Sequence, residues 1–314
     1  MAKHISVMLD RCIDLLTPSI QATQNPVVVD ATLGLGGHSE ALLEKFPQLT
    51  LIGIDRDPEA LALATARLSK YAGRFLPVHA VYDEILEVIT SLGFKKVNGI
   101  LFDLGISSMQ VDESERGFSY SIEAPLDMRM DRSQGQSAAD LVNNASRDEL
   151  IRILRQYGEE RFAPRIVDAI IRERELKPLN STSFLAELVK ENIPAATRRT
   201  GGNPAKRTFQ ALRIAVNDEL GALTRALPDS MSALVVGGRL VVMSFQSLED
   251  KIVKELFVKS TTSGTPRGLP VEIPELAAKF ALVIKSSEKA TDSEVETNPR
   301  AQSVRLRAIE RRAA

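Results

Sequence analysis

The chain of 314 residues has one cysteine, no tryptophan and a net charge of only −1. A single cysteine, Cys12, excludes an internal disulfide and fits a reducing compartment. The three histidines and the cysteine show no metal-ligand spacing, so we expect no metal site. A net charge near zero gives no global signal for nucleic-acid binding, and any such site must be a local patch.

The sequence also lacks a long apolar run. No stretch is long enough to cross a bilayer, and charged residues interrupt the start of the chain where a signal peptide would be apolar. We therefore expect a cytoplasmic protein without a membrane partner. The length is sufficient for two domains, and a homodimer is compatible with the sequence.

The stretch from Val27 to His38 combines an apolar run with a cluster of glycines. Three successive valines suit a buried strand that ends at Asp30. Gly34, Gly36 and Gly37 then permit a tight turn and a close approach of the backbone to a ligand, and helical spacing follows. Strand, glycine turn and helix form the ligand-holding corner of an open α/β sheet.

The spacing of the glycines excludes two standard phosphate loops. The third glycine of an NAD fingerprint would fall on Ser39, and no lysine follows as in a P-loop. A second apolar run ends at Asp55, where an acid suits a ribose diol. A nucleoside ligand without pyrophosphate fits best, and the sulfonium of S-adenosylmethionine would be attracted by Asp30 and Asp103. Alternatively, the glycines only form a turn and Asp55 only caps a helix.

The alternation of apolar runs and helical patterns predicts a doubly wound α/β sheet. Further strands are expected at Phe75–His79, Gly99–Phe102, Leu240–Ser244, Phe280–Ile284 and Val304–Ile309. Residues 3–16 suit an amphipathic helix or arm that stops at Thr17-Pro18. Asp57 suits the N-cap of a later helix, and Pro58 suits its first residue. One long helix is expected from Thr208 to about Leu227, and the charged segment Ser286–Thr297 is expected to be mobile.

Residues 113–213 lack strand periodicity and contain several helical stretches, which indicates an inserted helical domain. Residues 1–112 and 214–314 would then form the sheet domain. Within the insertion, Thr197–Arg213 carries several cations and no acid, which suits either a phosphate-contacting surface or a solvated face. Phe118 and Tyr120 follow Arg116 and would stack a base or belong to a small core.

No nucleophile triad is visible. Ser107-Ser108 lies in a loop after the strand that ends at Asp103, but no histidine base is evident nearby in sequence. His38 begins a helix, so its backbone N–H can face a carboxylate, while its side chain is either a ligand contact or a polar surface group.

Many motifs in this order resemble the H-type methyltransferases of small-subunit ribosomal RNA, which methylate N4 of a cytidine in 16S rRNA. The resemblance covers nearly the whole chain. The motifs that carry it are Gly36-Gly37-His38-Ser39, Ile54-Asp55-Arg56-Asp57-Pro58, Asp103-Leu104-Gly105-x-Ser107-Ser108, Glu115-Arg116-Gly117-Phe118-Ser119, Pro125-Leu126-Asp127-Met128-Arg129-Met130-Asp131, Tyr157-Gly158-Glu159-Glu160-Arg161, Arg207-Thr208-Phe209-Gln210-Ala211-Leu212-Arg213, Ser247-Leu248-Glu249-Asp250 and Asn298-Pro299-Arg300.

The resemblance implies a class I, Rossmann-like methyltransferase sheet with an inserted all-helical domain that recognises the substrate. It implies S-adenosylmethionine as cofactor and 16S rRNA within the small ribosomal subunit as partner. Cofactor contacts are expected at Gly36, Gly37, His38, Asp55, Tyr82, Asp103 and Gln110. Substrate contacts are expected at Arg116, Phe118, Arg129, Arg207 and Arg213.

Two positions depart from the family pattern. Tyr82 stands where phenylalanine is usual, and Gln246 replaces a histidine before Ser-Leu-Glu-Asp, so we assign Gln246 no catalytic role. The expected chemistry is direct in-line methyl transfer to the amine of a base that has left its stack, with Asp103 as an orienting acceptor.

Two other functions are compatible with parts of this pattern. A ribosome-assembly factor could use the cofactor only as a structural ligand. A DNA N4-methylase usually carries an Asp/Ser-Pro-Pro-Tyr/Trp loop, and Asp103-Leu104-Gly105-Ile106 stands in its place.

Overall fold

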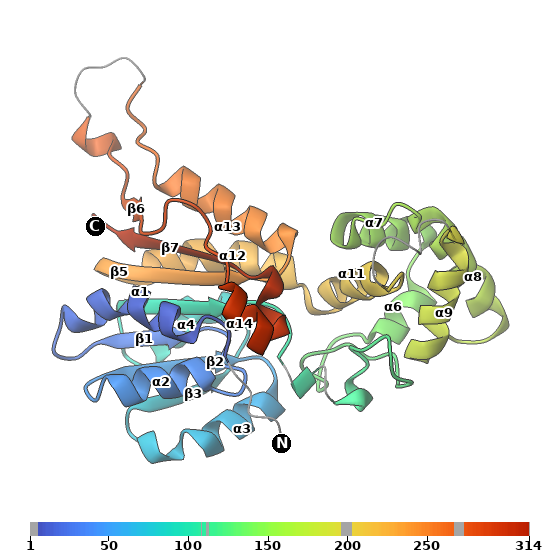
Figure 1. Ribbon diagram of the computed structural model, residues 1–314, viewed down its shortest axis with the longest axis horizontal. Helices are drawn as coiled ribbons and strands as arrows, with labels where there is room; N and C mark the ends of the chain where they lie inside the picture. Colours follow the sequence, from blue (N-terminus) through green and yellow to red (C-terminus); the bar gives the residue numbers. More distant parts are fainter. Residues whose placement is uncertain (1–5, 108, 111–112, 196–202, 267–272, 314) are drawn as a thin grey trace. The chain divides into compact units, whose positions relative to one another are not determined.

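The structure is a computed structural model that describes residues 6–107, 109–110, 113–195, 203–266 and 273–313 (Figure 1). It divides into two compact units, which are described separately below. The sheet unit comprises Met1–Gly105 and Leu220–Ala314, and the helical unit comprises Ile106–Glu219. Within the described ranges, no helix is both long and apolar enough to span a membrane.

The described strands of the sheet unit form a seven-stranded sheet in the order β3-β2-β1-β4-β5-β7-β6. Its strands are β1 (Val27–Asp30), β2 (Thr50–Asp55), β3 (Phe75–His79), β4 (Val97–Asp103), β5 (Leu234–Ser244), β6 (Phe280–Leu282) and β7 (Arg305–Arg311). The first five are parallel, and β7 is antiparallel to both β5 and β6. This confirms the predicted Rossmann-like class. The strand order reverses between β1 and β4, where open α/β sheets bind their ligands.

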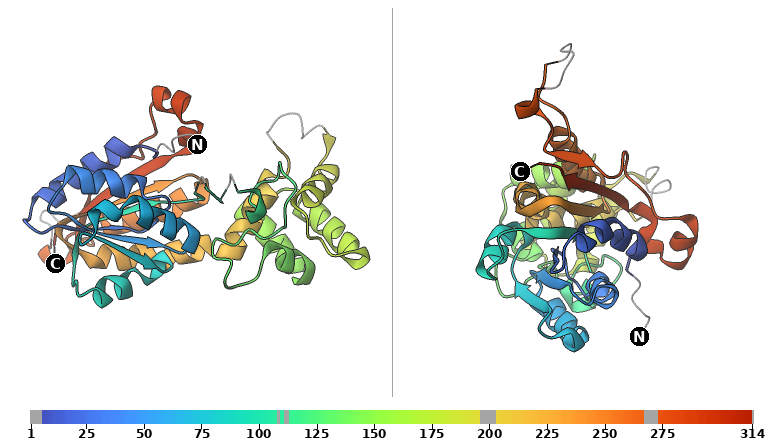
Figure 2. Two further views of the ribbon diagram at one scale, coloured as in Figure 1. Left: turned by 90° about the horizontal axis from the view of Figure 1, so that it is seen from below. Right: turned by 90° about the vertical axis from the view of Figure 1, so that its left-hand side faces the viewer.

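Helices cover both faces of this sheet (Figures 1 and 2). Along β1, Val28 faces one core, whereas Val27 and Val29 face the other, because successive side chains point to opposite sides of a strand. The first core is closed by α1 (Leu9–Gln21), α2 (Gly37–Lys45) and α3 (Pro58–Arg67). The second core is closed by α4 (Ile85–Ser91), α12 (Glu219–Ala233) and α13 (Ser247–Ser260).

The helical unit has an apolar core of its own, which includes Leu154, Ile166 and Leu212. Its described helices are α6 (Ala138–Asn144), α7 (Arg147–Gly158), α8 (Ala163–Leu176), α9 (Thr182–Asn192) and α11 (Lys206–Asn217). Its described residues contain no strand beyond the isolated bridge between Pro125 and Ser181.

The prediction that the first helix stops at Thr17-Pro18 was wrong. Helix α1 continues to Gln21 and contains Pro18 in its interior. A proline there removes one helical hydrogen bond, but Leu16 and Ile20 on either side are completely buried against the sheet. Burial of this apolar face outweighs the local cost.

The long helix predicted from Thr208 to about Leu227 was also wrong, because the chain breaks between α11 and α12. Asp218 has a left-handed backbone with φ of 48°. The side chain of Asn217 fixes the break, since its amide donates to Met128 O and its oxygen accepts from Met130 N, both at 2.8 Å. Hydrophobic periodicity continues across the break and therefore does not reveal it.

The segment expected to be mobile contains regular structure. Glu288 forms an antiparallel bridge with Leu306, and its carboxylate pairs with Arg11 at 2.7 Å. The segment ends in α14 (Asp292–Thr297), which Thr291 caps through its side chain. These contacts hold it against the start of α1.

Candidate functional site

Three carboxylates end three neighbouring parallel strands of the sheet unit. Asp30, Asp55 and Asp103 are the last residues of β1, β2 and β4. Because β1 pairs with both other strands in parallel, the three acids lie at the same edge of the sheet. This edge includes the switch point of the strand order, where open α/β sheets bind their ligands.

The glycine turn after β1 depends on backbone conformations that glycine allows. Gly36 has φ of 76°, a left-handed conformation that costs other residues about 1–2 kcal/mol. A Cβ there would also lie 3.2 Å from Leu68 Cδ1. At Gly37, the first residue of α2, a Cβ would overlap the hydroxyl of Ser6. Because the two glycines have no side chains, Leu68 and Ser6 can pack closely against the turn.

Asp55 holds this turn through its carboxylate. Its Oδ2 accepts from the Gly34 N–H at 2.7 Å, and its Oδ1 accepts from the Asp57 N–H at 2.8 Å. Asp57 in turn caps α3, as its position before Pro58 predicted. Burial raises the pKa of Asp55 to about 6. Each carboxylate oxygen has a second lone pair, so ribose hydroxyls could still donate to Asp55.

Asp30 is buried and bonded mainly by its own loop. Its Oδ2 accepts from the Ser39 hydroxyl at 2.7 Å, and Oδ1 accepts from the Thr32 N–H at 3.3 Å. Burial raises the pKa of Asp30, and the nearby charge of Asp103 adds to this effect. Ser39 was not predicted as a site residue, although its place directly after Gly-Gly-His was a signal for this bond.

Asp103 is partly exposed, with 29% of its side chain accessible. Its backbone N–H donates to Thr32 Oγ1 at 2.6 Å, which ties the loop after β1 to the end of β4. Burial raises the pKa of Asp103 to about 7. Thr32 was not predicted as a site residue, and nothing in the sequence pattern distinguishes it.

His38 lies between the site and the N-terminal arm, which is formed by residues 6–8 before α1. Its ring is 5% exposed, with Nε2 3.0 Å from Val7 O and Nδ1 3.6 Å from Asp103 Oδ2. Burial lowers the pKa of His38. Of the two roles left open for its side chain, a polar surface group is therefore excluded, because both ring nitrogens face groups of the protein.

Tyr82 begins a short 3-10 turn after β3. Its ring meets that of Phe102 edge to face, with 5.5 Å between the centroids. Phe102 directly precedes Asp103, so this aromatic pair is anchored on the strand that carries the acid. Gln110 belongs to the helical unit, where its Oε1 accepts from the Ser107 N–H at 3.1 Å. Ser108 lies outside the described residues.

The charges of this edge suit a cationic ligand. Among the described residues, no lysine or arginine forms an ion pair with Asp30, Asp55 or Asp103. Buried carboxylates without such partners are costly, and a bound sulfonium or ammonium would reduce the cost. The described part of the chain offers no cluster of side chains that could hold a metal ion.

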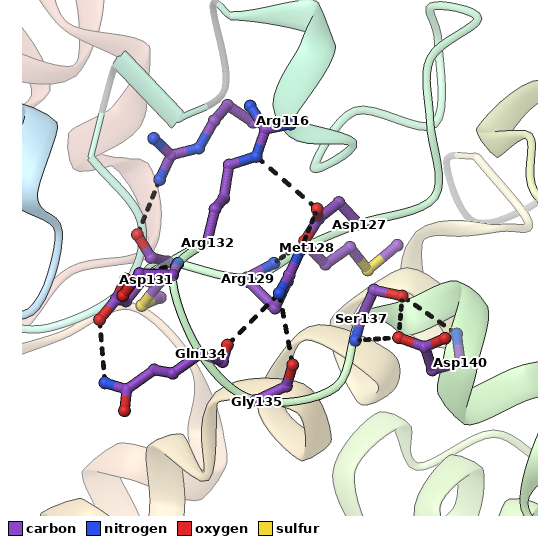
Figure 3. A network of polar contacts seen from close by, with 12 residues as sticks. Arg116, Asp127, Met128, Arg129, Asp131, Arg132, Gln134, Gly135, Ser137 and Asp140 are labelled. Carbon is purple, nitrogen blue, oxygen red and sulfur yellow. Dashed lines mark hydrogen bonds and ion pairs between the residues drawn. The ribbon is translucent and has the colours of Figure 1, made fainter.

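Two of the predicted substrate residues belong to a loop network in the helical unit (Figure 3). Arg116 is only 2% exposed, and its Nη2 donates to Met130 O at 2.8 Å. Arg129 clasps Asp127 through two hydrogen bonds of 2.8 and 2.9 Å. Burial acts to raise the pKa of Asp127, but the hydrogen bonds and the charge of Arg129 outweigh this and lower that pKa. Both arginines thus hold the loop that carries them.

The other predicted substrate residues differ in exposure. Phe118 is buried in the core of the helical unit, in line with the alternative that it belongs to a core. Arg213 forms a bidentate pair with Glu219 at 2.8 and 3.0 Å. Arg207 is exposed, and its Nη1 donates to Glu159 O at 3.1 Å. Residues 197–202 of the predicted basic stretch lie outside the described part.

Comparison with known proteins extends over the whole chain. The family model of the MraW methylase family matches residues 1–312. A protein of Renibacterium salmoninarum named ribosomal RNA small subunit methyltransferase H is 55% identical over 313 residues, covering 98% of this chain and 95% of the relative. A protein of the same name from Thermobifida fusca is 54% identical, covering 98% of this chain and 93% of the relative.

Solved structures are more distant in sequence. An rRNA methylase from Streptococcus thermophilus aligns over 99% of both chains with 12% identity and a TM-score of 0.43. A methyltransferase from Streptococcus mutans in complex with SAH aligns over 98% of this chain and 99% of the other, with 12% identity and a TM-score of 0.45. The family model and the relatives span this chain almost from end to end, and the chain therefore belongs to the MraW methylase family.

Proposed function

We propose that this protein transfers the methyl group of S-adenosylmethionine to N4 of a cytidine in the 16S rRNA of the small ribosomal subunit. The relatives at about 55% identity carry the name ribosomal RNA small subunit methyltransferase H, which supports the rRNA substrate. The observation that carries the proposal is the edge with three carboxylates beside the glycine turn. Its negative charge fits a cationic methyl donor and its backbone permits a close approach.

In this proposal, each residue of the edge has a distinct task. Gly36 and Gly37 leave room for the donor beside the start of α2, where backbone N–H groups without helical partners favour its carboxylate. Asp55 accepts from the ribose hydroxyls through its remaining lone pairs. Asp103 faces the positive end of the donor, and Tyr82 packs beside its base. Bound donor supplies an activated methyl group at a sulfonium.

The acceptor nitrogen requires orientation. The lone pair of a cytosine amine is delocalised into the ring, so the amine must pyramidalise as its nitrogen attacks the methyl carbon in line. An acceptor for its N–H groups would favour that geometry. As the new N–C bond formed and the S–C bond of the donor broke, the sulfur would keep the electron pair and leave as a neutral thioether, and the nitrogen would give one proton to the acceptor. Asp103 is partly exposed, whereas Asp30 is buried and both oxygens of Asp55 already accept from backbone N–H groups, so we assign this role to Asp103. A bound base must leave its stack to reach it.

The helical unit is proposed to recognise the RNA, with the exposed Arg207 as a candidate contact. Gln110 is assigned to the cofactor by resemblance. Arg116, Arg129 and Arg213 are engaged within the unit and are proposed to act by shaping its surface.

The test is transfer of label from methyl-labelled S-adenosylmethionine to small subunits lacking the modification, followed by mass spectrometry of the rRNA. We expect one labelled cytidine, and Asp103→Ala to abolish labelling while the circular dichroism spectrum is retained. Asp14→Ala, which alters an exposed acid on α1, is the matched control. Binding of the donor without any labelling would favour the rival function of an assembly factor, and turnover by Asp103→Ala would reject the role of Asp103.

A further inference from the structure

An open cleft of about 500 Å³ lies in the sheet unit, at the start of α13. It is lined by residues from the segment after β5, the first two turns of α13, the segment before α14, the segment between α14 and β7, and the first residue of β7. These are Phe245, Gln246, Ser247, Asp250, Lys251, Lys254, Lys289, Gln302, Ser303, Val304 and Arg305. No role assigned above uses this cleft.

Four cations line the cleft, and three segments of the chain contribute them. Lys251 and Lys254 project from one face of α13, since residues three to four apart in a helix are neighbours. Lys289 and Arg305 come from two segments joined by the antiparallel bridge between Glu288 and Leu306. These cations come from separate parts of the sequence and converge only in the folded chain, unlike a continuous run of charges.

The acids near the cleft are engaged elsewhere. Asp250 is clasped by Arg307 through hydrogen bonds of 2.7 and 3.0 Å, so its charge is compensated. Glu288 pairs with Arg11 on α1. Glu249 accepts from the backbone N–H groups of Phe245 and Gln246.

The cations themselves have few acidic partners. Lys251 lies 4.0 Å from Glu255, with both side chains about two-thirds exposed, and such a pair is weak. In the described part of the chain, Lys254, Lys289 and Arg305 have no ion pair with an acid. The cleft is therefore strongly positive although the whole chain is nearly neutral.

The cleft lies close to the proposed reaction centre within the same unit. β5 pairs with β4 so that Met243 is opposite Asp103, and Phe245 follows two residues later. The ring of Phe245 is 3.8 Å from where a Cβ of Gly105 would be. A ligand in the cleft would therefore be near the edge at which Asp103 ends its strand.

We propose that this cleft binds backbone phosphates of the substrate RNA beside the nucleotide that is methylated. The inference rests on the proposed function. Phosphate oxygens suit the four cations, and the side chains of Ser247, Gln302 and Ser303 can donate further hydrogen bonds. A concave site favours a chain of phosphates over a flat anionic membrane, and its closeness to Asp103 favours the RNA that is the substrate.

The test compares two double variants with the same loss of charge. Lys254→Gln with Lys289→Gln removes two cations of the cleft, whereas Lys95→Gln with Lys259→Gln removes two exposed lysines outside it. Each lost phosphate contact lowers the slope of log affinity against log salt by about 1, so the cleft variant should lose about 2. A change of 1 in this slope means that each lysine contributes about ten-fold in affinity when the salt concentration falls from 1 M to 0.1 M.

Binding to small subunits is measured by filter retention from 0.05 to 0.5 M salt, and methylation is measured in parallel. We expect the cleft variant to raise KM at least ten-fold while kcat at saturating subunits and affinity for S-adenosylmethionine stay unchanged. The control variant should match the wild type. Equal salt slopes in all three proteins would overturn the cleft assignment and leave the proposed function intact, because the wild type would still methylate.

A second arm separates RNA from a lipid surface. The same proteins are sedimented with vesicles of 30% phosphatidylglycerol in phosphatidylcholine. Loss of vesicle binding in the cleft variant, with unchanged binding to small subunits, would overturn the proposal in favour of a membrane. Absence of methylation by the wild type would instead reject the proposed function itself.

Discussion

His38 Nδ1 lies 3.6 Å from Asp103 Oδ2, while His38 Nε2 is 3.0 Å from the carbonyl oxygen of Val7. A carbonyl oxygen only accepts, so Nε2 carries a hydrogen in every protonation state of the ring. The neutral ring then directs the lone pair of Nδ1 at Asp103. The contact between His38 Nδ1 and Asp103 Oδ2 is favourable when one proton lies between these atoms. It is unfavourable when neither atom carries a proton. The proton state of Asp103 is thus coupled to a buried ring that the N-terminal arm holds.

The first prediction concerns the pH dependence of donor binding. Burial raises the pKa of Asp103 to about 7, so below that pH the ligand-free site holds a neutral acid. The ionised form attracts a sulfonium, so affinity for S-adenosylmethionine should increase by up to ten-fold per pH unit toward pH 7 and level off above it. Titration calorimetry from pH 5.5 to 8.5 measures this, with about one proton released on binding at pH 6.

The control for this prediction is S-adenosylhomocysteine, which has the same nucleoside and amino acid but a neutral sulfur. Its affinity should vary much less over the same range. Asp103→Asn should remove the dependence for the methylated ligand as well. Equal pH profiles for the two ligands would contradict the role of Asp103 toward the sulfonium.

The second prediction concerns the stability of the ligand-free protein. The pKa of Asp103 is raised relative to the unfolded chain, so its contribution to stability is complete below about pH 4 and is lost as the pH rises through about 7. Asp103→Asn stays neutral throughout. The difference in unfolding free energy between variant and wild type should therefore grow in favour of the variant from pH 5.5 to pH 8.

Because Asp103 is partly exposed, we expect a gain of only about 1 kcal/mol, or about 2–4 °C in Tm. Differential scanning calorimetry at both pH values measures it. Asp55 titrates in both proteins and cancels in the comparison, whereas any change in the titration of His38 is part of the effect of removing Asp103. A variant that is less stable than the wild type at pH 8 would show that the ionised acid is well accommodated. The expected loss of methylation together with gained stability is the trade-off common at active sites.

The third prediction concerns the contact between the N-terminal arm and α2. A Cβ at Gly37 would overlap the hydroxyl of Ser6, whereas the Cβ of Ser6 would lie 3.5 Å from it, an ordinary contact. Gly37→Ala should therefore cost about 1–3 kcal/mol by overpacking. In the background of Ser6→Ala the cost should fall by more than half. A double-mutant cycle in urea unfolding gives this coupling, and additive effects of the two changes would disprove the contact.

Local chemistry in the sequence predicted much of the sheet unit. The runs that end at Asp30, Asp55 and Asp103 became β1, β2 and β4, because a buried parallel strand needs a continuous apolar stretch. Asp57 before Pro58 was sufficient to place the start of α3, since both act on the first helical turn.

Features that depend on distant parts of the chain were not predictable in this way. Pro18 reads as a stop, yet burial of its neighbours keeps α1 intact. The basic stretch that ends at Arg213 contains no acid. Glu219 lies a few residues beyond the stretch and forms an ion pair with Arg213. Likewise, His38 has one partner in the arm and another on β4, and no sequence spacing encodes such a pair.

The last prediction separates two arginines that sequence alone treats alike. Arg213 and Glu219 are 15% and 8% exposed, so removing the arginine leaves a buried carboxylate without its bidentate partner. Arg213→Ala should cost about 3 kcal/mol of stability. Glu219→Gln in the same chain should recover part of that loss, because a neutral amide does not need a cationic partner. The salt slope of RNA binding should stay unchanged for both variants.

Arg207→Ala should behave in the opposite way. Arg207 is exposed and its side chain donates to the backbone of Glu159, so the change should alter stability by less than about 0.5 kcal/mol. If Arg207 contacts a phosphate, its loss should lower the salt slope by about 1. Urea unfolding and filter binding on the same preparations give both quantities. A reduced slope for Arg213→Ala with native stability would instead place Arg213 on the RNA, because only a cation released from Glu219 can bind a phosphate.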